Sequence, residues 1–214
     1  VGARYGSLAS GLLGGMVSST AVTVSFAQHA REDLRLSHAA TLAVLAATVV
    51  TLPRMLIEVA VVDAQLVPAA VGPLGLLFVA AVLPLLLCWR HCQVVATEAV
   101  PRVKNPANLR FAVTFGLAYA VVTLAVAAVQ QLGSGFGIYL VGALSGIPQV
   151  DAITLSTARL ISQGRIELGA GLDMMVLGFL ANLATKGLIA TIVAPPQMWR
   201  PLLTGFAAIA VAGI

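Results

Sequence analysis

Long apolar stretches constrain the fold of this chain more than any other feature. A membrane-crossing α-helix needs about 20 predominantly apolar residues. Stretches of about that length cover 5–28, 39–62, 68–88, 111–131, 136–160 and 172–194, and a shorter one covers 201–214. They are continuously apolar and do not alternate with period 2, which favours helices over a β-barrel. The sequence therefore predicts an all-α, polytopic transmembrane helix bundle of about seven spans, forming a single transmembrane domain over 1–214.

The scarcity of charge agrees with this prediction. Only 9% of the residues are charged, whereas a soluble domain carries about a quarter. A soluble enzyme, a disordered region and a nucleic-acid-binding protein are thereby effectively excluded. The net charge of +4 fits loops that face an anionic membrane surface. We find neither a nucleophile with a matching base nor a Walker-type phosphate loop, so we expect no enzyme activity and no cofactor.

The basic residues gather in alternate loops. The first predicted loop, over 29–38, and the third, over 90–110, hold most of them, and Arg159 and Arg165 fall around the fifth. Because Lys and Arg collect on the cytoplasmic side, the odd-numbered loops are expected inside and Val1 outside.

The sequence also matches itself when it is shifted by 131 residues. Nine identities fall within the first 28 positions, among them four glycine pairs and Thr23/Thr154. Background usage would give roughly two or three. We therefore predict an internal duplication, with repeat one over about 1–90 and repeat two over about 108–214.

The order of the spans bears on how the two copies are related. The stretch 111–131 precedes the second copy and has no counterpart before the first, so we expect a further span upstream of Val1. The second Gly-rich helix is the fourth span after the first, so both would cross in the same direction and the repeats would be parallel. If one Gly-rich segment is re-entrant, the repeats would be inverted. The loop charges favour the parallel arrangement.

In the middle of each Gly-rich span, the glycines give way to polar residues. Glycines at 14–15 and 146 are followed by the polar residues of 18–20 and 149–151, which include residues preferred as helix N-caps. A helix that stops and restarts at membrane depth is tolerated only inside protein or beside a water-filled cavity. Transporters build substrate sites from such breaks. We therefore predict two broken Gly-rich helices that meet near the bilayer midplane.

The glycines allow a second interpretation as close-packing positions, since Gly11/Gly15 and Gly142/Gly146 are both small-xxx-small pairs. Asp151 does not share that interpretation. A carboxylate near the bilayer centre costs at least ~2.5–3.5 kcal/mol, so it is functional by default. Capping of a helix is its alternative role.

Three other charges lie within predicted spans. Arg54 and Glu58 are four residues apart, which suits an ion pair on one helix face. The alternative for them is an exposed or snorkelling pair near the outer end of the helix. Lys186 is expected to pair with Asp151 across two helices, and a pair that opens on protonation would be a coupling device.

The chain resembles a known but uncharacterised family, through the segments 11–21 and 151–156 and the motifs Pro53-Arg54 and Asn105-Pro106. The sequence is similar to the multi-span membrane domain found C-terminal to MgtC/SapB-type domains in bacteria and archaea. The resemblance covers essentially the whole chain and implies a multi-pass protein of the prokaryotic inner membrane, linked by name to magnesium physiology. It implies no established activity. Gln149 departs from the acidic residue usual at that position, which leaves Asp151 as the candidate metal ligand.

These features lead us to expect a membrane transporter or channel for a small ion or solute, proton-coupled through Asp151. The alternative is a non-transporting regulatory or scaffold subunit of a larger complex. Helix N-termini favour an anion, whereas a carboxylate among oxygen ligands favours a cation, and the family name tips the expectation slightly to a cation. The expected site consists of Ser18, Ser19, Thr20, Thr23, Gln149, Asp151, Thr154, Asn182 and Lys186.

The expected partners follow from the same features. They are the lipid bilayer, the transported ion or solute, and either a second copy of the chain or an MgtC/SapB-type domain. No nucleic acid is expected.

Overall fold

The computed structural model describes residues 3–91 and 150–213, and within these ranges the chain is helical. The helices are α1 (Ala3–Glu32), α2 (Ser37–Val62), α3 (Val67–His91), α6 (Val150–Ser162), α7 (Leu168–Val193) and α8 (Pro196–Ala212), with short 3₁₀ turns η1 (Leu34–Leu36) and η2 (Ala64–Leu66). Four of the helical segments are long and apolar enough to cross a membrane: Tyr5–Glu32, Leu34–Val62, Ala64–Arg90 and Leu168–Val193. The chain is thus a helical membrane protein. The predicted span 111–131 and the start of 136–160 lie outside the described residues.

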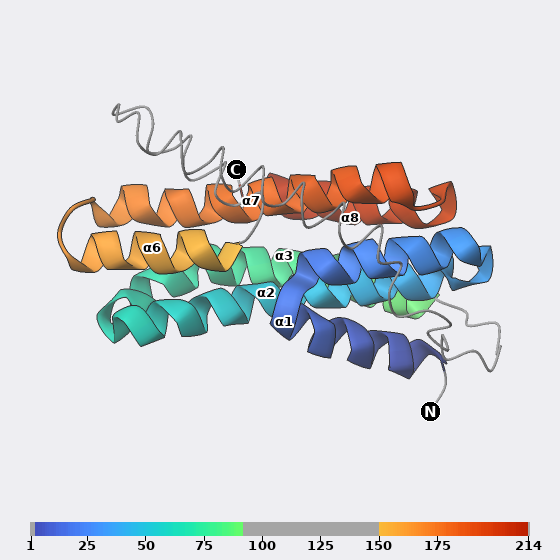
Figure 1. The fold of residues 1–214 in the computed structure, drawn as a ribbon. Helices are drawn as coiled ribbons and strands as arrows, with labels where there is room; N and C mark the ends of the chain where they lie inside the picture. The colour runs from blue at the N-terminus through green and yellow to red at the C-terminus, as the bar shows by residue number, and fades with distance from the viewer. Residues whose placement is uncertain (1–2, 92–149, 214) are drawn as a thin grey trace.

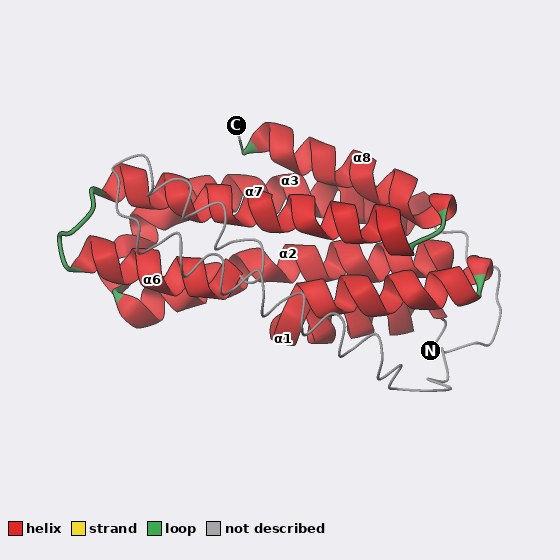
Figure 2. Cartoon of the chain, turned by 45° about the horizontal axis from the view of Figure 1, so that its top comes forward, coloured by secondary structure: helices red, strands yellow, loops and turns green. Residues whose placement is uncertain are grey.

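Helix α2 forms the centre of the bundle (Figures 1 and 2). It packs against α1, α3, α6 and α8. Of the residues in its most apolar segment, 72% are buried, compared with 22% for the corresponding segment of α3 and 39% for that of α7. Large apolar side chains such as Leu52 and Met55 fill the space between the helices. Because α2 is enclosed, any polar group at its middle must find its partners inside the protein.

Helix α1 is broken and folds back on itself at Ser18. Ser18 has extended backbone angles (φ −160°, ψ 107°) inside the helix, and its Oγ accepts the N–H of Ala21 at 3.2 Å as an N-cap does. A Cβ placed on Gly14 would lie 2.6 Å from Cγ2 of Val22, although eight residues of straight helix span about 12 Å. The arms 3–17 and 19–32 therefore meet at Ser18 and run back toward the same end of the bundle, as a hairpin whose arms diverge from the tip (Figure 1).

The predicted break in the first Gly-rich helix is therefore present. The expected straight crossing over 5–28 is not, because the helix reverses direction at the break (Figure 1). The span is long and apolar enough to cross a membrane, yet its hairpin brings both ends to the same end of the bundle (Figure 1). We call residues 15–20, where the two arms meet, the α1 tip.

Glycines let the first arm of α1 lie directly against α2. A Cβ on Gly11 would lie 2.3 Å from the carbonyl oxygen of Ala43, and one on Gly15 would lie 2.6 Å from Cα of Ala47. Only glycine fits such backbone contacts. Both glycines thus have the packing role that was the alternative interpretation, in addition to lying beside the break.

The fold-back bears on the directions of the segments that the 131-residue shift aligns. The second arm of α1 and α6, which the 131-residue shift aligns, run in opposite directions, as do α2 and α7 (Figure 1). The expected parallel arrangement is therefore wrong for these segments, because α1 does not cross from one end of the bundle to the other. For the same reason, the loop that holds Arg165 lies at the opposite end from the first loop and not at the same end.

Candidate functional site

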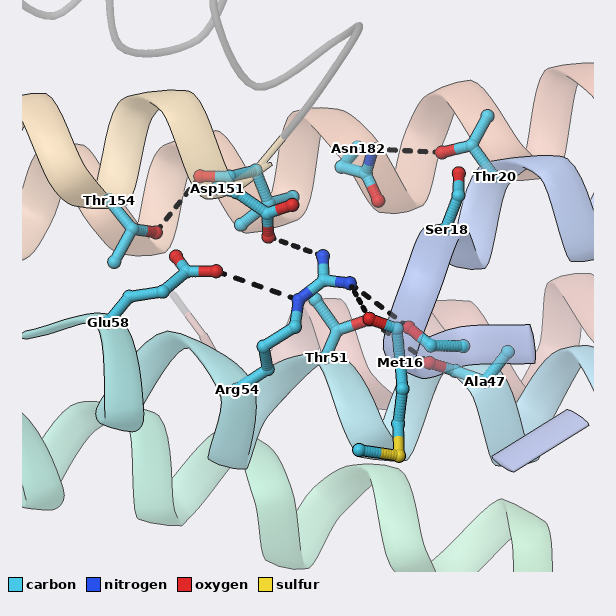
Figure 3. A network of polar contacts seen from close by, with 12 residues as sticks. Met16, Ser18, Thr20, Ala47, Thr51, Arg54, Glu58, Asp151, Thr154 and Asn182 are labelled. Atoms are coloured by element: carbon cyan, nitrogen blue, oxygen red, sulfur yellow. Dashed lines mark hydrogen bonds and ion pairs between the residues drawn. The ribbon is translucent and has the colours of Figure 1, made fainter. Parts of the chain in front are cut away.

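The guanidinium of Arg54 organises the polar contacts at the middle of the bundle (Figure 3). Its Nη1 donates to the carbonyl oxygens of Gly15 at 3.1 Å and Met16 at 3.0 Å. These carbonyls end the first arm of α1, where a cation complements the negative end of the helix dipole. Arg54 therefore caps the interrupted helix from α2.

Arg54 also holds two carboxylates. Its Nη2 donates to Oδ1 of Asp151, and its Nε lies 3.6 Å from Oε1 of Glu58. The three side chains are 15–20% exposed. The predicted Arg54–Glu58 pair is thus confirmed, and its position in the bundle interior argues against snorkelling.

The expected pair between Lys186 and Asp151 is wrong, because Asp151 is paired with Arg54. Asp151 lies in the first turn of α6, where a carboxylate complements the positive end of the helix dipole. Arg54 therefore joins the carbonyl end of one half-helix to the amino end of another.

Helix α7 contacts the α1 tip from the other side. Nδ2 of Asn182 donates to Oγ1 of Thr20 at 3.4 Å, and both residues are buried. Lys186 follows one turn later on the same face and is fully buried. Neither the Lys186 Nζ nor the Asn182 Oδ1 has a hydrogen-bond partner among the described residues.

A small cavity of about 20 Å³ lies between the α1 tip, Arg54, Asp151 and Asn182, and Lys186 does not line it. This volume holds about one water-sized group. The lining residues are Val17, Ser18, Ser19, Thr20, Arg54, Val150, Asp151 and Asn182. The structure thus brings five of the predicted site residues to one place, from three helices.

The other predicted residues are placed differently. Thr23 and Thr154 are buried and donate to carbonyl oxygens of their own helices, those of Ser19 and Val150, both at 2.9 Å. Neither lines the cavity. Gln149 lies outside the described residues, as does the break predicted in the second Gly-rich helix.

Sequence reasoning missed Arg54 and Glu58 as members of the site. Both are charges within a predicted span, but their nearness to the α1 tip depends on the hairpin, which brings Gly15 and Met16 to Arg54. Within the described ranges, no group of three or more His, Cys, Asp or Glu is arranged to hold a metal ion. Asp151, the candidate metal ligand, is engaged by Arg54.

Comparison with known proteins places the chain in a family of unknown function. A family model described as "Domain of unknown function (DUF4010)" matches residues 1–194. An uncharacterised protein of Aquifex aeolicus (strain VF5) is 30% identical over 181 residues, which cover 83% of this chain and 76% of that protein. No solved structure matches this chain.

Proposed function

We propose that this chain, which belongs to the DUF4010 family, is a membrane transporter or channel for a small ion or solute. The observation that supports this most is the α1 tip, where an interrupted helix, the Arg54–Asp151 pair and Asn182 surround a small polar cavity. Interrupted helices at membrane depth are the usual framework of transporter sites.

An internal duplication and about seven spans belong to the same proposal. Helices α2 and α7 have the same length of 26 residues, and their first residues, Ser37 and Leu168, are separated by the 131-residue shift. The same shift aligns Ser18 with Gln149, directly before the described start of α6. The opposite directions of the aligned helices favour inverted repeats, an arrangement used for alternating access around a central site.

The charges around Arg54 support coupling to protons. One guanidinium faces two carboxylates, those of Glu58 and Asp151, and the two carboxylates also interact with each other. The cluster has a formal charge of −1 when both are ionised, and uptake of one proton would neutralise it. Arg54 is already paired with the Asp151 carboxylate. This carboxylate is therefore weaker evidence for a transported cation than it was in the sequence alone.

A scaffold subunit is the second candidate function. Gly11 and Gly15 pack directly against the backbone of α2. This is the arrangement expected for glycines whose role is helix packing alone. In this case we would expect association with a second copy or with an MgtC/SapB-type domain in a prokaryotic inner membrane.

Flux measurements separate these two functions. The purified chain would be reconstituted into liposomes and screened with monovalent and divalent cations and with small anions. We expect uptake above empty vesicles that Asp151→Asn strongly reduces. Asp63→Asn is the matched control, because Asp63 lies in a turn, where its side chain caps η2. Uptake equal to that of empty vesicles across the whole panel would favour the scaffold.

A further inference from the structure

A separate, larger cavity lies between the start of α2, the end of α3 and the first half of α8. This is the end of the bundle at which α1 joins α2 (Figure 1). The volume of the cavity is about 440 Å³, within the range of about 300–1,000 Å³ that is usual for ligand sites. We call it the α2–α3–α8 pocket. It shares no lining residue with the small cavity at the α1 tip.

The pocket is polar at its mouth and apolar further in. His38, near the start of α2, and Cys88, in the last turn of α3, line the mouth, whereas Leu45 and Leu83 line the deeper part. The Thr204 hydroxyl also lines the pocket, but it donates to a carbonyl oxygen of its own helix at 2.9 Å. Seven residues of α2 separate His38 from Leu45, a rise of about 10 Å. One hydrocarbon leaflet is about 15 Å thick, so the pocket has a depth suited to part of an acyl chain.

The two tryptophans of the chain indicate the depth of the mouth in the membrane. Trp89 directly follows a lining residue at the end of α3, and Trp199 lies two residues before one at the start of α8. Trp89 packs edge-on against Tyr5 with ring centroids 5.2 Å apart, and the Arg200 guanidinium lies 5.6 Å from the Trp199 ring centroid. Trp and Tyr are enriched at the membrane–water interface. The mouth therefore lies at headgroup level, and the pocket extends from it into the hydrocarbon.

The mouth of the pocket is also surrounded by positive charge. Arg35, Arg90 and Arg200 are exposed, and each lies within three residues of a residue that lines the pocket. No Asp or Glu of the sequence lies so close to a lining residue. The nearest in sequence is Asp33, five residues before His38, and its carboxylate accepts the N–H of Arg35. Basic clusters beside an apolar pocket between membrane helices favour anionic lipid headgroups.

We propose that the α2–α3–α8 pocket binds one anionic phospholipid of the surrounding leaflet. One acyl chain lies between the three helices, and the headgroup lies at the basic end that Arg35, Arg90 and Arg200 share. Two lining residues of α3, Leu83 and Leu87, are 58% and 49% exposed, so the chain can enter sideways from the bilayer. This site goes beyond the proposed transport function, because none of its lining residues belongs to the α1 tip.

Native mass spectrometry of the full chain purified in detergent tests the proposal. The probes are phosphatidylglycerol, which is anionic, and phosphatidylcholine with identical acyl chains. We expect one phosphatidylglycerol to bind each chain, more tightly than phosphatidylcholine does. Arg200→Gln should weaken phosphatidylglycerol binding roughly fivefold, as expected for one basic residue near a headgroup. Arg165→Gln is the matched control, because Arg165 is equally exposed but lies at the opposite end of the bundle.

Two further variants test whether the acyl chain lies in the pocket. Thr204 and Ala208 line the pocket and are exposed on α8, so a large side chain at either position can occupy the pocket without entering the core. Thr204→Trp and Ala208→Trp should therefore lose the preference for phosphatidylglycerol. Ala207→Trp is the control and should bind as the unmodified chain does, because Ala207 is exposed on the same helix and does not line the pocket.

Three results would overturn the proposal. The first is equal binding of the two phospholipids, and the second is an unchanged preference in both Thr204→Trp and Ala208→Trp. The third is a lipid-free dimer that dissociates in Ala208→Trp and not in Ala207→Trp, which would assign the pocket to a second copy of the chain. Equal weakening by Arg200→Gln and Arg165→Gln would also contradict it, because the attraction would then come from net charge and not from this end of the bundle.

Discussion

Arg54 donates to the Asp151 carboxylate from the same guanidinium that caps the carbonyl end of the first arm of α1. A single side chain thus joins three helices at the level where one of them is interrupted (Figure 3). This connection makes the hairpin, the ion pair and the cavity parts of one structure, so perturbing Arg54 should affect all three.

Arg54→Met should strongly destabilise the protein, by about 3–5 kcal/mol, because removal of one partner leaves buried carboxylates without a counter-charge. The free energy of unfolding would be measured by reversible denaturation in detergent. Asp151→Asn in the same chain should restore part of the loss, since it removes one of the two unpaired charges. Additivity of the two substitutions within about 0.5 kcal/mol would show that the residues are not coupled.

Gly15→Ala should destabilise the hairpin, by about 1–3 kcal/mol for an overpacked contact. The added Cβ would lie 2.6 Å from Cα of Ala47, a backbone atom that cannot move aside as a side chain can. Gly72→Ala is the control, because a Cβ at Gly72 has no atom within 4 Å among the described residues. If both variants unfold at the same denaturant concentration, the close contact between α1 and α2 is not present in the membrane-protein fold.

The membrane class and the position of the first break could be read from sequence, because both depend on local chemistry. Continuous apolar stretches predict spans, and Ser18 follows the glycines as an N-cap residue should. The reversal of direction at that break could not be read in this way. A broken helix and a hairpin have the same residues, and the difference lies in the packing of Gly14 on Val22 and of Gly15 on Ala47.

The candidate site shows the same division. Ser18, Thr20, Asp151 and Asn182 could be selected as polar residues in apolar surroundings. The partner of Asp151 could not, because Lys186 and Arg54 are both basic residues within spans. Both α2 and α7 pack against α6, so the choice depends on which of the two basic side chains reaches the Asp151 carboxylate, and in the structure this is Arg54.

The proposed site should be reached by water. Thr20→Cys, in a chain whose natural cysteines are replaced, is expected to react with a small water-soluble thiol reagent because Thr20 lines the cavity. Thr48→Cys is the control and should stay unreactive, since Thr48 is fully buried and donates to a carbonyl of its own helix at 2.9 Å. Failure of the reagent to reach Thr20→Cys from either side of the membrane would support the scaffold function.

The α1 hairpin predicts the sidedness of three positions. Tyr5, near the start of the first arm, and Arg31, at the end of the second arm, lie at one end of the bundle, whereas Asp63 follows α2 at the other end. With single cysteines at these positions in oriented vesicles, an impermeant reagent should label Tyr5→Cys and Arg31→Cys from the same side. Asp63→Cys should be labelled from the opposite side. If Tyr5→Cys is labelled together with Asp63→Cys and not with Arg31→Cys, α1 crosses the membrane as a straight helix, and the proposed inverted repeats would have to be abandoned because they require the fold-back at Ser18.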